Sequence, residues 1–186
     1  MARVPYVDSE DVPPEHRDLL VSSLQDRPLH VYRALGNNPA VLAGLRSFFA
    51  ALWSDTGLRE RERELVILAA ARERENAYEW HQHVRIAGSA GVNEAEMRAI
   101  ADGDLGDFDD REAALIGYAR AVVRDAVTDE RHAAVAAEYD DATVVGIAAL
   151  AGGYAMLGGL IDAFDLELEE GESFFGWRPG GGESGD

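Results

Sequence analysis

The stretch 144–161 constrains the fold more than any other part of the sequence. Its 18 consecutive residues carry no charge and are mostly apolar, a length that just reaches what a transmembrane helix needs. Gly and Ala lower its hydrophobicity, and both of its flanks are acidic rather than basic. We therefore predict a buried central helix over 141–164, not a membrane span. The glycine pairs 152–153 and 158–159 allow another backbone to approach closely, which favours a subunit interface.

Helical periodicity also covers most of the remaining chain. Apolar residues recur every three or four positions in segments that begin near residues 14, 39, 58, 78, 94, 110 and 129. Three of these segments have good N-cap residues at their start, namely Asn93, either Asp109 or Asp110, and Thr128. No run of residues alternates between apolar and polar as a strand does. The pattern predicts an all-α bundle of about seven or eight helices, the first of them running from Pro14 to Gln25.

We expect the helices to form a single domain spanning residues 1–186, since this length is enough for one sizeable core. Residues 1–16 contain three prolines and are predicted to form an extended arm. Residues 169–186 are rich in Gly and Glu, so a flexible acidic tail is expected there.

The charge composition excludes some classes of binding partner. The chain has 35 acidic and 17 basic residues, a formal net charge of −18, and all its basic residues are Arg. Such a surface repels nucleic acid and anionic membranes, so neither is an expected partner. The composition also indicates a halophilic source, because high salt screens self-repulsion. There is no Cys and no apolar signal segment near the N-terminus, so we expect a soluble cytoplasmic protein without disulfides or Cys-based zinc sites.

Residues 61–91 hold the strongest candidate site. Two helical patterns meet there at a short polar joint. Glu79 and His83 are four residues apart and project from one helical face, while Glu64 interrupts an apolar run on the preceding helix. Two carboxylates and an imidazole in an apolar setting can transfer protons, so these three residues are the candidate catalytic group.

Interpretations without a catalytic role also remain open for these three residues. Glu79 and His83 can form a surface pair that contributes only a few tenths of a kcal/mol, and the pattern alone favours an exposed Glu64. The three side chains offer only weak evidence for a metal, and we expect no metal or other cofactor. Trp53 and Tyr154 are expected in the core or at an interface. The arginines between residues 59 and 85 are expected to pair with neighbouring Glu, although one or two can bind a substrate carboxylate.

The run RERELVILAAARERENAYEWHQHVRIAGSAGVNEAEMRAI resembles the carboxymuconolactone decarboxylase family, within the alkylhydroperoxidase D-like (AhpD-like) superfamily. The resemblance covers roughly residues 45–125. Its most specific part is Y-E-W-x-x-H-x-x-x-A, which starts at Tyr78 and includes Glu79 and His83. The resemblance implies an AhpD-like helical fold and a homo-oligomer, a trimer or a hexamer.

The peroxidase branch of this superfamily has a Glu, a C-x-x-C pair twelve residues later, and a His four residues after the second Cys. Glu64 and His83 occupy the Glu and His positions, whereas Asn76 and Glu79 occupy the two Cys positions. A chain without thiols cannot cycle through a disulfide, so the family label of peroxiredoxin activity is not expected to apply. The decarboxylase branch uses no cofactor and is the better match.

The resemblance therefore implies a small lyase that acts on a carboxylated lactone-type small molecule. His83 would be the general acid, Glu79 and Glu64 would set its tautomer or relay the proton, and an Arg would hold the carboxylate. The alternative is a non-catalytic oligomeric helical protein that keeps the same skeleton as core.

Overall fold

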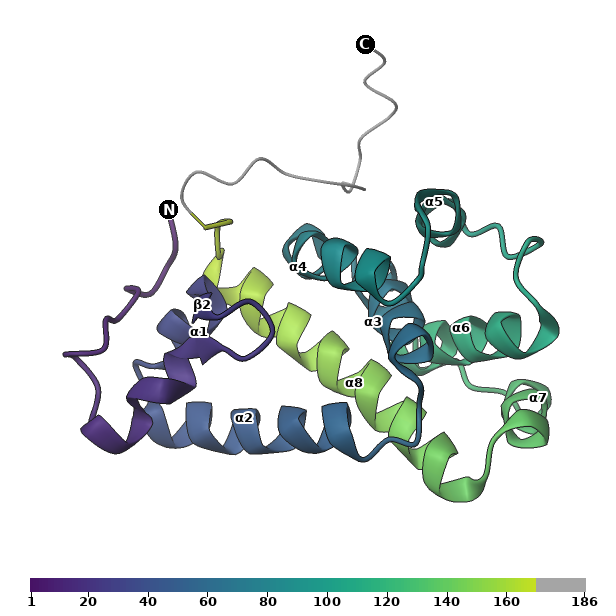
Figure 1. The fold of residues 1–186 in the computed structure, drawn as a ribbon, viewed down its shortest axis with the longest axis horizontal. Helices are drawn as coiled ribbons and strands as arrows, with labels where there is room; N and C mark the ends of the chain where they lie inside the picture. The colour runs from purple at the N-terminus through teal and green to yellow at the C-terminus, as the bar shows by residue number, and fades with distance from the viewer. Residues whose placement is uncertain (170–186) are drawn as a thin grey trace, which may run out of the picture. The chain divides into compact units, whose positions relative to one another are not determined.

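The computed structural model describes residues 1–169, and most of these residues are helical. The helices are η1 (Pro14–Leu20), a 3-10 helix, and the α-helices α1 (His30–Leu35), α2 (Pro39–Ser54), α3 (Glu60–Glu73), α4 (Ala77–Ser89), α5 (Glu94–Asp102), α6 (Asp110–Val123), α7 (Asp129–Glu138) and α8 (Asp141–Phe164). The two strands are β1 (Val21–Ser22) and β2 (Arg27–Pro28). The predicted mostly helical fold is confirmed, and Figure 1 shows its helices in order.

The first predicted helix is wrong beyond Leu20. Instead of continuing to Gln25, the chain forms a two-residue antiparallel hairpin of β1 and β2. Ser22 accounts for the change, because its hydroxyl accepts a hydrogen bond from the Leu24 amide, and such a local side-chain bond competes with helix formation. Asp26 then takes a left-handed conformation with φ 51°, which closes the turn.

The predicted N-caps are confirmed. The Asn93, Asp109 and Thr128 side chains each accept a hydrogen bond from a first-turn amide of α5, α6 and α7, respectively. Asn93 also forms a full capping box with Glu96. These caps satisfy amides that a helix leaves without intrahelical partners, so the sequence defines where each helix begins.

Contacts group the described residues into two compact units, one of residues 1–51 with 160–169, the other of residues 52–159. In the first unit, the N-terminal arm packs with the segment that follows α8. The Arg3 amide donates to the Phe164 carbonyl at 2.8 Å, and the Glu169 carboxylate accepts from the His30 amide at 2.9 Å. Residues 1–13 lack helix and strand, as predicted for the arm. Glu169 is buried rather than part of a free tail; the rest of the predicted tail lies outside the described residues.

In the second unit, α3 is the innermost helix. It packs against α4, α5 and α6, and Figure 1 shows α3 beside α4 and α6. All residues from 62 to 71 are buried, so this helix has no solvent-facing side over most of its length. A helix enclosed in this way forces any polar side chain on it to find a partner inside the protein.

Helix α8 has the predicted bounds. Within residues 1–169 it is the one helix long and apolar enough to cross a bilayer, with a mean hydropathy of 1.9 over an 18-residue window that is half buried. A core helix of a globular protein meets the same criteria. Two of its glycines contact their own chain: a Cβ on Gly146 would lie 2.8 Å from the Thr56 backbone, and one on Gly158 would lie 3.5 Å from Asn76. The predicted subunit interface on α8 stays a prediction.

Candidate functional site

Two adjacent helices bring the three predicted site residues together. Glu64 lies on α3, and Glu79 and His83 lie on α4. The short joint between these helices ends at Asn76, whose side chain accepts a hydrogen bond from the Glu79 amide at 2.9 Å and thereby begins α4. The Asn76 amide group also donates to the Gly158 carbonyl of α8 at 3.2 Å. Asn76 therefore fixes the start of the helix that carries the imidazole.

The three side chains form one buried group centred on His83. His83 Nδ1 lies 3.0 Å from Glu64 Oε2, which is a hydrogen bond, and His83 Nε2 lies 4.0 Å from Glu79 Oε2, which is too long for one. Glu64, Glu79 and His83 are 1%, 3% and 5% exposed. The exposed position that the pattern favoured for Glu64 is therefore wrong, because α3 is enclosed all round.

Burial and charge shift the pKa values of this group. Burial raises the pKa of Glu79 from its usual 4.5 to about 7, although the charge of His83 opposes the shift. Burial lowers the pKa of His83, but the charge and hydrogen bond of Glu64, together with the charge of Glu79, outweigh burial and leave the pKa above 6.5. The surroundings of His83 therefore favour its protonated form more than those of a free imidazole do, while Glu79 gains and loses a proton near pH 7.

Two aromatic rings that sequence reasoning assigned to the core or an interface flank the imidazole. The Trp53 ring lies 6.3 Å from the His83 ring between centroids, and the Tyr154 ring lies 5.1 Å away at 84°. Trp53 Nε1 donates to the Tyr154 hydroxyl at 3.4 Å. Trp53 comes from the last turn of α2 and Tyr154 from α8, so no local spacing in the sequence could have placed them at this site.

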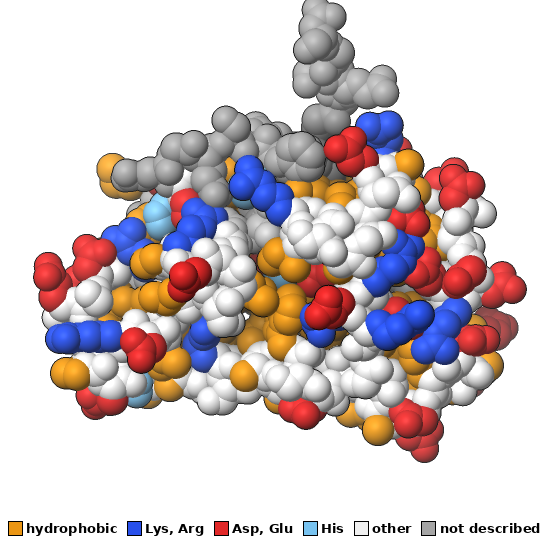
Figure 2. All heavy atoms as spheres, viewed as in Figure 1, with side chains coloured by type: hydrophobic (Ala, Val, Ile, Leu, Met, Phe, Trp, Pro, Cys, Tyr) orange, Lys and Arg blue, Asp and Glu red, His pale blue; other side chains and the backbone are white. Residues whose placement is uncertain are grey.

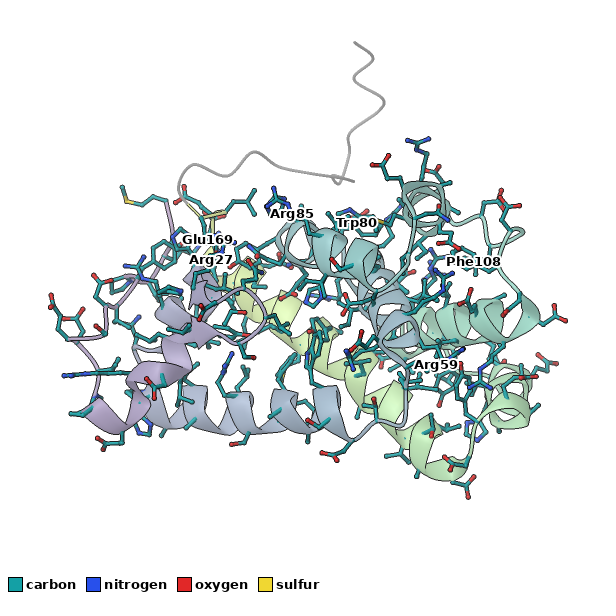
Figure 3. The ribbon with its side chains drawn as sticks, viewed as in Figure 1. Arg27, Arg59, Trp80, Arg85, Phe108 and Glu169 are labelled. Atoms are coloured by element: carbon teal, nitrogen blue, oxygen red, sulfur yellow. The ribbon has the colours of Figure 1, made fainter. Side chains whose placement is uncertain are left out.

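Trp80, which follows Glu79 on α4, is 1% exposed and belongs to the core (Figure 3). Tyr78 is also buried. Across residues 1–169, no three or more His, Cys, Asp or Glu side chains are grouped so as to hold a metal ion.

A second buried carboxylate on α3, that of Glu62, contrasts with the candidate site. Glu62 Oε1 accepts hydrogen bonds from Arg59 at 2.8 Å, Arg111 at 2.9 Å and the Tyr139 hydroxyl at 3.0 Å. Burial raises the pKa of Glu62, but these donors and the Arg59 amide outweigh burial and lower the pKa to about 2. Figure 3 shows Arg59 where the chain enters α3. This carboxylate is permanently ionised and fully paired, as a structural ion pair requires.

The expected pairing of arginines with acidic residues also holds for Arg61. Its guanidinium donates to Glu96 and to Glu112, at 2.7 Å in each case, and to the Gly91 carbonyl. Figure 2 shows basic and acidic side chains side by side over the part of the molecule formed by α5, α6 and α7. These pairs tie α3 to α5 and α6.

Comparison with known proteins agrees with this arrangement. The model of the carboxymuconolactone decarboxylase family matches residues 39–121, a segment that includes Glu64, Glu79 and His83. Over this segment the chain is similar to the carboxymuconolactone decarboxylase family. No curated protein matches the sequence.

Solved structures with the AhpD-like fold resemble this chain along nearly its whole length. The alkylhydroperoxidase AhpD core protein from Ralstonia eutropha JMP134, an uncharacterized peroxidase-related protein, has a TM-score of 0.80 at 18% identity and covers 91% of this chain and 93% of its own. The debrominase Bmp8 has a TM-score of 0.79 at 17% identity, with coverages of 90% and 92%. A peroxidase-related protein from Silicibacter sp. TM1040 has 0.78 at 14%, covering 90% of each. The family match supports the predicted resemblance, and these structures confirm the predicted AhpD-like fold.

Proposed function

We propose that this chain is a cofactor-free enzyme that decarboxylates a small carboxylated lactone-type substrate by proton transfer at His83. One observation carries the proposal: a buried imidazole has a carboxylate hydrogen-bonded to one nitrogen and a second carboxylate, with a pKa of about 7, beyond the other. Groups poised near neutral pH are efficient proton donors and acceptors. A helical core residue without a chemical role has no need of such an arrangement.

The reaction follows from the geometry. As the bond between the ring carbon and its carboxylate breaks, CO2 leaves and the electron pair moves onto the conjugated carbonyl as an enolate. Protonated His83 gives its Nε2 proton to the carbanion carbon, and Glu64 holds Nδ1–H in place and stabilises the imidazolium. Glu79 then returns a proton from solvent to Nε2. Each turnover takes up one proton and releases one CO2.

The aromatic rings next to His83 support a ring-shaped substrate. Trp53 and Tyr154 lie against His83, and flat apolar side chains suit a small unsaturated ring. A single-residue variant of the debrominase Bmp8, which has a TM-score of 0.75 and 18% identity to this chain, was solved in complex with 2,3,4-tribromopyrrole. An AhpD-like fold thus accommodates a five-membered ring in that protein. A thiol peroxidase is not proposed, because none of the 186 residues is Cys.

The test is an activity screen in high salt. Carboxymuconolactone and related carboxylated lactones are incubated with the full chain, and CO2 release and proton uptake are measured together. We expect turnover, and we expect His83→Ala to lower kcat about 10²- to 10⁴-fold, the usual contribution of a general acid. Glu79→Gln should lower kcat and flatten its pH dependence near the pKa of about 7.

The matched control is His132→Ala, which removes an exposed imidazole on α7 and should leave kcat unchanged. Turnover that survives His83→Ala would refute the site assignment. Absence of turnover on every lactone would remove the decarboxylase proposal.

A further inference from the structure

Arg63 is a buried cation for which residues 1–169 provide no anionic partner. Arg63 is only 8% exposed. It forms no ion pair with any side chain in residues 1–169, whereas Arg61 on the same helix pairs with two carboxylates. Within that described part of the chain, Arg63 Nε is buried and has no hydrogen-bond acceptor. An unpaired buried charge is costly unless something compensates it.

Two contacts hold the Arg63 side chain without neutralising it. Its Nη1 donates to the Trp53 carbonyl at 3.0 Å, and its guanidinium carbon lies 4.0 Å from the centre of the Trp53 ring. The first contact satisfies a carbonyl at the end of α2, and the second is a cation–π interaction that contributes about 0.5–2 kcal/mol. Neither contact uses the fork geometry by which an Arg binds a carboxylate through two N–H groups.

Arg63 belongs to the same site as His83. The Trp53 ring contacts the guanidinium and also stacks against the imidazole. The positive charge of Arg63 is close enough to lower the pKa of His83, against the effect of Glu64. Next to Arg63 in the chain, Glu64 Oε1 is likewise buried without a hydrogen-bond donor in residues 1–169. An unused acceptor therefore lies on the carboxylate that binds the imidazole, and an unused donor lies on an Arg whose guanidinium contacts the same Trp53 ring as the imidazole.

We propose that Arg63 binds an anionic carboxylate of a small cyclic substrate, through its unused N–H, while the substrate ring packs against Trp53. This assignment rests on the proposed function and names the residue that recognises the substrate. The carboxylate that Arg63 holds is not the one that leaves. A carboxylate paired with Arg63 would lose that attraction as it became CO2, so pairing the leaving group would stabilise the ground state more than the transition state.

The competing explanation is that Arg63 only supports the end of α2 through the Trp53 carbonyl. Binding experiments separate the two roles, because a purely structural Arg has no effect on anion affinity in a folded protein. The probes are benzoate and its uncharged analogue benzamide, measured by calorimetry on the full chain at one fixed salt concentration. His83 is followed in parallel by NMR, since neutralising the charge of Arg63 should raise the pKa of the imidazole.

We expect benzoate to bind at least about 10-fold more tightly than benzamide, and to raise the pKa of His83. Arg63→Gln should weaken benzoate binding about 10- to 100-fold, the usual range for a lost hydrogen bond to a charged group, and leave benzamide binding unchanged. Arg63→Lys, which keeps the charge, should fall between the two. The control Arg85→Gln removes an exposed charge from α4 (Figure 3) and should behave like the wild type.

Equal affinity for benzoate in wild type and folded Arg63→Gln, or no measurable benzoate binding by the wild type, would overturn the assignment. The result is separable from the test of the proposed function. Arg63-dependent benzoate binding without turnover of any lactone supports the anion site and refutes decarboxylation. Lactone turnover with benzoate affinity independent of Arg63 supports decarboxylation and refutes the anion site.

Discussion

Replacing Glu79 by Gln should stabilise the protein at neutral and alkaline pH. Glu79 is 3% exposed, and burial raises its pKa from 4.5 to about 7. The folded state therefore holds a proton on Glu79 that the unfolded chain has already released between these two pH values. Stability that this group contributes is fully present below pH 4.5 and is lost as pH rises through about 7. Gln keeps the shape of the side chain but never ionises.

The pKa shift of Glu79 determines how much Glu79→Gln should stabilise the protein. A difference of one pKa unit is equivalent to about 1.4 kcal/mol, so a rise from 4.5 to about 7 corresponds to roughly 3 kcal/mol when Glu79 is fully ionised. Local relaxation of the site reduces this figure, and we expect Glu79→Gln to raise the free energy of unfolding by about 2–3 kcal/mol at about pH 8. Below pH 4.5 the variant and the wild type should differ by less than about 0.5 kcal/mol, because both then bury a neutral group.

Urea denaturation followed by circular dichroism, at pH values from about 4.5 to 8 and one salt concentration, measures the difference. Glu10→Gln is the matched control, since it removes an exposed acid from the N-terminal arm and separates the loss of one negative charge from the loss of a buried one. The reasoning fails if Glu79→Gln and Glu10→Gln shift stability equally, or if the effect of Glu79→Gln does not grow between about pH 5 and pH 8.

Four further substitutions test the surrounding structure by the same denaturation assay. Glu62→Gln should lower stability by roughly 2 kcal/mol at about pH 7, and because the folded pKa is lowered to about 2, this difference should shrink as pH falls from 4.5 toward 2. A difference that is constant over that range would contradict the pairing. Asn76→Ala removes an N-cap and a buried hydrogen bond and should destabilise by about 1–3 kcal/mol; an unchanged midpoint would contradict its role. Gly146→Ala should destabilise by about 1–3 kcal/mol, since its Cβ would meet the Thr56 backbone at 2.8 Å, whereas Gly152→Ala, with no atom within 4 Å, should be neutral or stabilising by up to about 1 kcal/mol.

Local rules were sufficient to predict most of the helices. Asn93, Asp109 and Thr128 mark helix starts because their side chains satisfy amides within the same turn, and such bonds depend on adjacent residues alone. The wrong prediction of a helix through Ser22 also has a local cause. The Leu24 and Asp26 amides donate hydrogen bonds to Ser22 and form a turn inside a segment whose periodicity is helical. The spacing of apolar residues alone does not show whether a segment forms such a turn or a helix.

The candidate site was predictable in part. The spacing of Glu79 and His83 is a property of one helix, so the sequence alone indicates that they face the same way. Glu64 was a candidate because it interrupts an apolar run, but the pattern alone favoured an exposed position, since its burial depends on α4, α5 and α6 surrounding α3. Trp53 and Tyr154 reach His83 from helices distant in the sequence, and only the three-dimensional arrangement shows those contacts.

Glu62 and Glu64 illustrate how one helix separates a structural role from a functional one. Both carboxylates are 1% exposed. Glu62 receives three side-chain donors and is fixed as an ion, so it stabilises the fold and has no capacity left to react. Glu64 has one oxygen bonded to His83 and the other unused within residues 1–169, beside an unpaired Arg63 and a Glu79 that burial keeps near its titration point. Each of these features lowers the stability of the fold, and all of them occur in one place. Proteins show this pattern where binding or catalysis requires unsatisfied groups. A polar group that merely remained in the core would be expected to find the kind of partners that Glu62 has.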